Sequence, residues 1–214
     1  ELGHNIMDHH LGVGASGTVE GYDDKYYYGR RPNGIYVPRF RNLFGDKRDY
    51  IRGFGYQGGA SRQGWSREIA EMNIGGDYKD AMTEAGDWGI FMMMQGETIP
   101  KETNHVRLST DKKDEWGIHQ LVFNVDYDDN DEKVLKDFFE QGSEMLSKAG
   151  CKNISARDSK QSPGLDIHEV GGVRMGKDPK TSLLNKWNQL HSCPNVFVTD
   201  GACMTSTSTQ NPSI

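Results

Sequence analysis

The sequence predicts an α+β fold, and two kinds of pattern in the middle of the chain indicate it. Three segments have the composition of strands: Trp88–Thr98 is apolar and rich in methionine, and His105–Ser109 and Ile118–Tyr127 alternate between apolar and polar residues. We expect them to be neighbouring strands of an antiparallel sheet, with the last two joined by the turn Asp111–Trp116. The residues after Asp129 instead have the spacing of an amphipathic helix.

The N-terminal region, residues 1–64, is dense in glycine, tyrosine and arginine and shows neither a strand nor a helix period. We therefore expect extended segments and loops that lie over a scaffold. Within it, Gly12–Gly17 matches the G-x-G-x-x-G dinucleotide fingerprint, which requires a buried strand before it and a helix after it. Residues 5–10 are too polar for such a strand, and residues 21–34 contain Pro32. The motif is interpreted as a glycine-rich turn, and a nicotinamide dehydrogenase built on it is the alternative.

The predicted helix has recognisable ends. Asp129 and Glu132 resemble a capping box at its start, and Gly150 is a suitable stop. Its apolar stripe consists of Val134, Leu135, Phe138, Phe139, Met145 and Leu146. Beyond it we expect a glycine-bearing loop over Cys151–Gly176 and a short strand over Asn195–Thr199.

Composition excludes several classes of function. The 214 residues can bury a core, and a net charge of -6 with scattered basic residues gives no footprint for nucleic acid. No apolar run is long enough to predict a transmembrane segment, and location in the cytoplasm or periplasm is left open. The three cysteines, Cys151, Cys193 and Cys203, lack zinc spacing, and the adjacent His9 and His10 point opposite ways on an extended chain. No metal site is expected.

Two clusters contain the side chains that are candidates for catalysis or ligand binding. His168 precedes the pair Gly171-Gly172, where the absence of Cβ lets the backbone approach a planar ligand. Histidine, with an unperturbed pKa of about 6.5, suits proton removal from a hydroxyl, although a single histidine in a glycine loop is more often structural. In the second cluster the predicted strand leads into Asp200-Gly201-Ala202, an arrangement common at ribose or phosphate crevices. A plain turn is the alternative there.

Several motifs follow one another in the last third of the chain. They are His168-Glu169-x-Gly171-Gly172-x-Arg174-Met175-Gly176, Asp178-Pro179, Asn185, Asn195-Val196-Phe197-Val198-x-Asp200-Gly201 and Asn211-Pro212. In order and spacing they resemble the C-terminal signature of the glucose-methanol-choline (GMC) oxidoreductases. Upstream, Leu2-Gly3-x-Asn5-x-Met7-Asp8-His9 and Asn104–Leu108 are similar to further segments of that family. Gly172 departs from it, since many members carry threonine there.

The resemblance implies an antiparallel sheet with helices on one side, the substrate-binding domain of the family, over residues 1–169. Residues 170–214 would form a C-terminal segment that completes an FAD-binding domain. The N-terminal dinucleotide fold of that domain is not in this sequence, so FAD binding would be incomplete in what we interpret as a fragment cut from a longer protein. The C-terminal segment should pack poorly alone, with apolar surface exposed or covered by self-association.

The resemblance also assigns roles to residues. His168 would take the proton of a CH–OH group as hydride leaves for N5 of FAD, and Asn211 would hydrogen-bond the substrate oxygen. Asp200, Gly201 and Ala202 would lie along the ribityl-pyrophosphate stretch, with Asn211 and Pro212 near the pyrimidine end of the flavin. The substrate would be a small alcohol, sugar or polyol, and the electron acceptor is open between oxygen, a quinone and a cytochrome.

A competing function is a carbohydrate-binding or scaffold domain without turnover, and the isolated fragment is expected to be inactive. The aromatic and basic loop of Tyr26, Tyr27, Tyr28, Arg30 and Arg31 is a candidate to close over a sugar, because tyrosine combines a flat apolar face with a hydroxyl. Surface or domain packing is the alternative for that loop.

Overall fold

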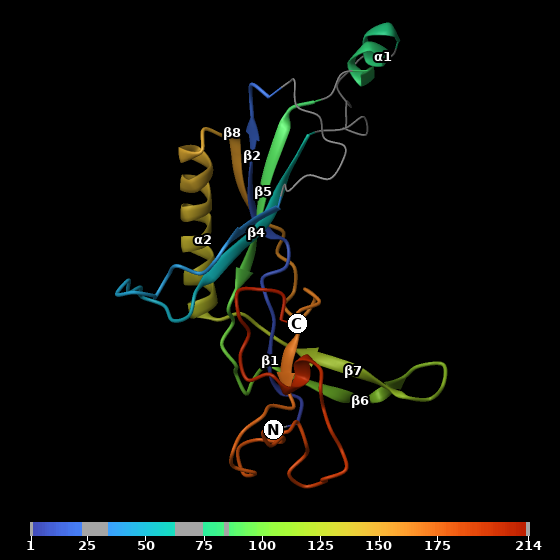
Figure 1. The fold of residues 1–214 in the computed structure, drawn as a ribbon. Helices are drawn as coiled ribbons and strands as arrows, with labels where there is room; N and C mark the ends of the chain where they lie inside the picture. The colour runs from blue at the N-terminus through green and yellow to red at the C-terminus, as the bar shows by residue number, and fades with distance from the viewer. Residues whose placement is uncertain (1, 23–33, 63–74, 84–85, 213–214) are drawn as a thin grey trace.

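The computed structural model describes residues 2–22, 34–62, 75–83 and 86–212, and its strands form two antiparallel sheets (Figure 1). The five-stranded sheet has the order β3 (Gly34–Val37), β4 (Phe54–Arg62), β5 (Trp88–Gly96), β2 (Val13–Val19) and β8 (Lys152–Asp158). The four-stranded sheet has the order β7 (His119–Asn124), β6 (His105–Lys113), β1 (His4–Met7) and β9 (Val170–Gly172). Outside the sheets lie the helices α1 (Gly76–Thr83) and α2 (Asp129–Lys148) and the short 3-10 turn η1 (Gly201–Cys203).

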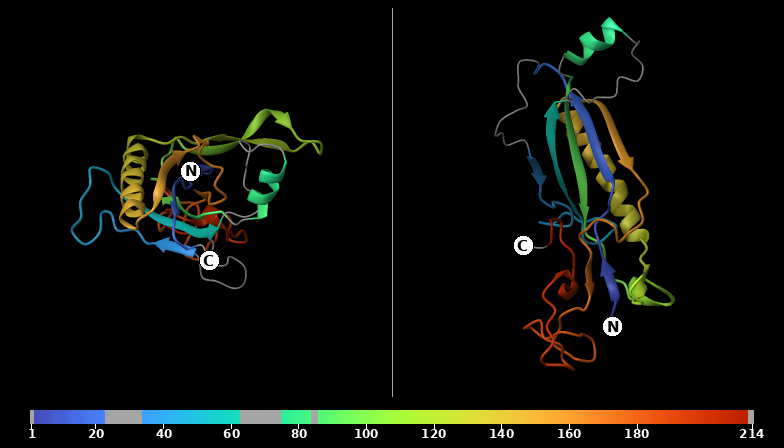
Figure 2. Two further views of the ribbon diagram at one scale, coloured as in Figure 1. Left: turned by 90° about the horizontal axis from the view of Figure 1, so that it is seen from above. Right: turned by 90° about the vertical axis from the view of Figure 1, so that its right-hand side faces the viewer.

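The long helix α2 covers one face of the five-stranded sheet (Figure 2). The core between them is aromatic: the ring of Phe138 on α2 lies 4.8 Å from the ring of Tyr56 and 5.7 Å from that of Phe54, both on β4. Gly142 lets the helix approach closely, because a Cβ there would lie 3.2 Å from the Cβ of Ala15 on β2. The predicted α+β class, an antiparallel sheet with a helix on one side, is confirmed.

The predicted helix is confirmed, but its cap is shifted by one residue. Asp128 is the N-cap, in extended conformation, and its side chain accepts from the backbone N–H of Asn130 and Asp131. The capping box therefore pairs Asp128 with Asp131, not Asp129 with Glu132. The predicted stripe does face the core: Val134, Leu135, Phe138 and Leu146 are buried, and Phe139 and Met145 pack against them.

Several predictions about strands were wrong. The segment Trp88–Thr98 forms β5 in the five-stranded sheet, whereas the next two predicted strands form the hairpin β6–β7 of the other sheet. The N-terminal region, expected as extended segments and loops, contains the paired strands β1 to β4, whereas the expected loop Cys151–Gly176 contains β8 and β9. Asn195–Thr199 makes only an isolated bridge, between Phe197 and Gln189.

Glycine explains why β2 and β4 were missed. Glycine carries no side chain to mark a strand period, yet here it lets neighbouring backbones come close. At Gly58 a Cβ would lie 1.9 Å from the carbonyl oxygen of Phe91 on the adjacent β5. The G-x-G-x-x-G motif likewise runs into β2, between β5 and β8, and Gly17, where the fingerprint would begin a helix, lies within this strand. The rejection of a dinucleotide fingerprint is confirmed, whereas the expected turn is in fact a strand.

The C-terminal segment is held by β9 and by backbone contacts rather than by a large core. β9 pairs with β1, and η1 lies against β9. Apolar side chains remain exposed in this region, including Trp187 and Phe197. None of the described helices has the length and apolar character needed to cross a membrane.

Candidate functional site

His168 lies two residues before β9, and the pairing of β9 with β1 decides what it meets. Met7, the last residue of β1, is opposite Val170. The chain after Met7 therefore runs alongside the residues just before Val170, which brings His9 to His168 although 159 positions separate them in sequence.

The two imidazoles are in direct contact. The Nδ1 atoms of His9 and His168 are 3.0 Å apart, and the rings meet edge to face with centroids 5.0 Å apart. The other ring nitrogen of His9, Nε2, lies 2.9 Å from the backbone carbonyl oxygen of Ser208. His9 is fully buried, and this burial lowers its pKa to about 4.

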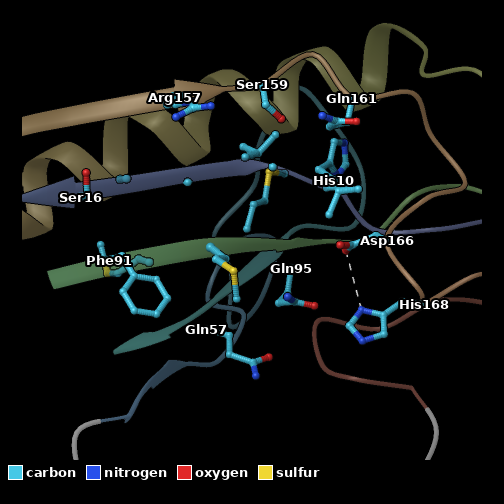
Figure 3. A pocket seen from close by; sticks show the side chains of 18 of the residues that line it. His10, Ser16, Gln57, Phe91, Gln95, Arg157, Ser159, Gln161, Asp166 and His168 are labelled. Atoms are coloured by element: carbon cyan, nitrogen blue, oxygen red, sulfur yellow. Dashed lines mark ion pairs between the residues drawn. The ribbon is translucent and has the colours of Figure 1, made fainter. Parts of the chain in front are cut away.

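A carboxylate stands beside this pair. Oδ2 of Asp166 is 3.8 Å from Nδ1 of His168, as the dashed line in Figure 3 marks. Burial raises the pKa of Asp166 to about 6, and the nearby charge of Asp8 adds to the effect. The backbone N–H of Asp166 donates to Oδ2 of Asp8, so the segment before His168 is tied to the segment after β1.

The backbone around His9 is anchored on both sides. The hydroxyl of Thr98 accepts from the N–H of Asp8 and donates to the carbonyl of Asp8. The hydroxyl of Tyr127 donates to the carbonyl of His9 at 3.1 Å. Thr98 follows the end of β5 and Tyr127 precedes α2, so two segments distant in sequence fix the backbone around His9.

His168 opens onto a pocket of about 750 Å³. In Figure 3, His10, Asp166 and His168 lie at one end of this pocket, and Phe91 and Ser16 lie at the other. Its walls come from β2 and β5 and are largely apolar, with Val13, Ala15, Phe91, Met92, Met93 and Met94 among them. Asn211 lines the same pocket, so the two predicted catalytic residues meet there.

The predicted cofactor residues divide between two places. Asn211 reaches the pocket, and Pro212 follows it near the end of the described chain. Asp200 instead caps η1, where its Oδ1 accepts from the N–H of Ala202 at 3.0 Å. Gly201 lies against the backbone beside His168, since a Cβ there would be 3.0 Å from the carbonyl oxygen of Glu169. The structure thus places η1 behind β9 and outside the lining of the pocket.

Sequence reasoning missed His9, Asp166 and the buried Gln95 as parts of this site. His9 was noted only within a family-like segment, and its partner is too distant in sequence for any local pattern to reveal. The loop of residues 26–31, the candidate to close over a sugar, lies outside the described residues.

The residues that could together bind a metal ion are not the adjacent histidines His9 and His10. The ring of His10 stacks on Tyr127, and His10 is not in the group of possible ligands that contains His9. His9, Asp166 and His168 do offer ligand atoms within 4.8 Å of one another. However, the 3.0 Å contact between the two Nδ1 atoms is a hydrogen bond only if one of them carries a proton, and a metal-bound nitrogen cannot.

Comparison with known proteins identifies a family and several relatives of the chain. Residues 100–214 match the family described as GMC oxidoreductase, a range that includes both His168 and Asn211. The chain is 29% identical to 2-methyl-1,2-propanediol dehydrogenase of Mycolicibacterium austroafricanum over 99% of its own length and 39% of that protein. It is 35% identical to paromamine 6'-oxidase of Streptomyces fradiae over 54% of the chain and 21% of that protein.

A third relative covers the whole chain. The large subunit of fructose dehydrogenase from Gluconobacter japonicus is 27% identical over 100% of the chain and 38% of that subunit. The chain thus spans between about a fifth and two fifths of the length of these relatives. Because the family match covers more than half of its residues and contains the residues that meet at the pocket, the chain belongs to the GMC oxidoreductase family.

Proposed function

We propose that this chain is the substrate-binding part of an FAD-dependent oxidoreductase that acts on CH–OH groups, with His168 as the base. The observation that carries the proposal is that His168 and Asn211 line one largely apolar pocket. Family membership supports it, as do relatives that are named as dehydrogenases or oxidases of a propanediol, of fructose and of paromamine.

The residues present fit part of a flavin site. A pocket with apolar walls and several polar groups, among them the imidazole of His168 and the amide of Asn211, suits the edge of a planar ring and the hydroxyl of a substrate. Gly201 gives close backbone packing directly behind His168. The described residues contain no unit of strand, glycine-rich loop and helix. In our proposal, the residues that bind the pyrophosphate of FAD therefore lie elsewhere in the protein.

In our proposal, residues 1–169 form the substrate-binding domain and residues 170–214 contribute to the flavin site through Asp200, Gly201, Ala202, Asn211 and Pro212. FAD, when bound, supplies the hydride acceptor. The residues of this chain supply the rest: His168 takes the proton of the substrate hydroxyl, and the amide of Asn211 donates to the substrate oxygen without changing charge. The apolar walls of β2 and β5 keep water from the reacting carbon.

The test is His168→Ala in the full-length, FAD-loaded protein. We expect the rate of flavin reduction, followed by anaerobic stopped-flow absorbance with a panel of sugars, polyols and choline, to fall by about 10²- to 10⁴-fold. His119→Gln on the distant strand β7 is the matched control and should reduce its flavin normally. Near-normal reduction in His168→Ala would refute the role of His168, and a stable but colourless full-length protein would favour a carbohydrate-binding module.

A further inference from the structure

We propose that His9 is a positioning residue that holds His168 in the tautomer with its proton on Nδ1, so that Nε2 is the nitrogen free to accept a proton. This inference rests on the proposed function of His168 as a base, and it adds which nitrogen acts and what selects it. The argument follows a chain of three groups: the carbonyl of Ser208, the ring of His9 and the ring of His168.

The first step is the proton on His9. A backbone carbonyl oxygen can only accept a hydrogen bond. Nε2 of His9 lies 2.9 Å from the carbonyl oxygen of Ser208, so this nitrogen must carry the hydrogen and donate it.

The second step is the charge of His9. Its side chain has no exposed surface, and burial disfavours the charged form of an imidazole. A neutral imidazole has one N–H, and its other nitrogen carries a lone pair. With the proton on Nε2, Nδ1 of His9 is therefore an acceptor.

The third step is the position of the proton on His168. Its Nδ1 lies 3.0 Å from the accepting Nδ1 of His9, so the hydrogen in that contact belongs to His168. The lone pair of a neutral His168 is then on Nε2. Free imidazole side chains in water favour the opposite tautomer, with the proton on Nε2. In that tautomer Nε2 cannot act as a base, so the choice of tautomer matters for catalysis.

Acidic groups near Nδ1 of His168 favour the same tautomer, with Nε2 as the nitrogen that takes a proton. Oδ2 of Asp166 is 3.8 Å from Nδ1 of His168, too far for a hydrogen bond but close enough to favour the positive charge that develops when Nε2 takes a proton. Asp8 and Glu169 contribute negative charge to the same neighbourhood.

The geometry is suited to a fixed role. Thr98 and Tyr127 hold the backbone of Asp8 and His9, as described above, and Ser208 holds the far side of the ring. The backbone of His9 is therefore held by Thr98 and Tyr127, and rotation of its ring away from His168 would break the bond to Ser208. A rigid acceptor selects one tautomer, whereas a mobile one would allow both.

Two isosteric substitutions separate the two hydrogen bonds of His9. In His9→Asn the side-chain amide lies near the position of Nδ1 and can keep an acceptor toward His168, while the contact with Ser208 is lost. In His9→Gln the amide lies near the position of Nε2 and can keep the donor to Ser208, while the acceptor toward His168 is lost. The proposal predicts damage in His9→Gln, whereas a purely structural role in holding Ser208 predicts damage in His9→Asn.

The direct readout is the tautomer itself, measured on this chain without any cofactor. Ring ¹⁵N shifts of selectively histidine-labelled protein, with His168 assigned by its loss in His168→Asn, distinguish a protonated from an unprotonated nitrogen. We expect the neutral form of His168 to carry its proton on Nδ1 in the wild type and in His9→Asn, and to move toward Nε2–H in His9→Gln.

The second readout is the rate of flavin reduction in the full-length, FAD-loaded protein. Because a wrong tautomer in a comparable hydrogen-bonded histidine costs about 10⁴-fold, we expect a loss of about 10- to 10²-fold in His9→Gln, where both tautomers become accessible. The substrate dissociation constant should change little, since His9 does not line the pocket.

Three results would overturn the proposal. They are a proton on Nε2 of neutral His168 in the wild type, an unchanged tautomer in His9→Gln, and stoichiometric Zn²⁺ binding that removes the proton from Nδ1. None of these is the result that would refute the proposed function, namely normal flavin reduction in His168→Ala, so the two failures can be told apart.

Discussion

His10 is buried like its neighbour His9, but its ring makes no hydrogen bond to the described residues. The ring of His10 stacks on Tyr127 with centroids 4.5 Å apart, and neither of its nitrogens has a hydrogen-bond partner among the residues that the structure describes. Burial lowers the pKa of His10 to about 4, with a smaller contribution from the charge of His9. The side chain is therefore neutral in the folded protein near pH 7, and protonating it requires exposing it.

This environment predicts acid sensitivity that His10→Phe should reduce. The folded pKa of about 4 lies below the unfolded value of 6.5, so the unfolded chain binds more protons between these values and stability is lost as pH falls through that window. For His10 the loss between pH 7.5 and pH 5 is about 2 kcal/mol. We expect urea unfolding to show a smaller decrease over this range in His10→Phe than in the wild type.

The same measurements contain their own control. The carboxyls of Asp131 and Asp166 have raised pKa values, about 6, which act in the opposite direction, but they are present in both proteins and cancel in the comparison. Any change in packing against Gly96, where space is tight, appears as a difference in stability at pH 7.5. An identical decrease with pH in both proteins would contradict the assignment to His10.

Among the individual elements, α2 begins at the N-cap Asp128, which forms a reciprocal capping box with Asp131. Asp128 accepts the N–H groups of Asn130 and Asp131 and also lies 3.2 Å from the ammonium of Lys101. Asp129, one residue later, is in the first turn and is favoured there only by the helix dipole. Because the helix covers the core, fraying at this end weakens the packing of the five-stranded sheet.

The cap gives a direct comparison between adjacent aspartates. We expect Asp128→Ala to lower the free energy of unfolding by about 1 kcal/mol and Asp129→Ala by only a few tenths, measured by urea unfolding. Asp128→Asn keeps an acceptor and should stay near the wild type. Equal losses for the two alanine variants would contradict the cap at Asp128.

At the scale of the whole molecule, the hairpin β6–β7 projects from the rest of the protein (Figure 1). Its register puts Leu108 opposite Leu121 and Val106 opposite Phe123, so these apolar side chains share one face. Leu108 is 61% exposed, Leu121 59% and Phe123 55%. A contiguous apolar patch of this kind is typical of a surface that another chain or domain covers.

We therefore expect the isolated chain to associate at increasing concentration. Leu121→Lys should reduce the association by placing a charge in the patch, and light scattering after size exclusion would show a lower mean mass. Gln120→Lys adds the same charge to the opposite face of β7 and should leave the association unchanged. A wild-type chain that is monomeric at every concentration would count against this expectation.

Features that depend on local pattern or on a series of motifs were predictable from the amino-acid sequence. The stripe of α2 was predictable because burial of one helix face imposes a 3.6-residue period, and the hairpin β6–β7 because its strands alternate. The order of motifs from His168 to Asn211 led to the family, which the match over residues 100–214 then showed.

The pairing of the strands and the surroundings of His168 became visible only in the folded chain. β2 and β4 are too rich in glycine to show a period, and their partners are chosen by contacts between distant segments. His9 meets His168 because β1 pairs with β9, a register that no stretch of neighbouring residues encodes. Local periodicity reports which side of an element is buried, whereas a hydrogen bond between residues 9 and 168 depends on the whole path of the chain between them.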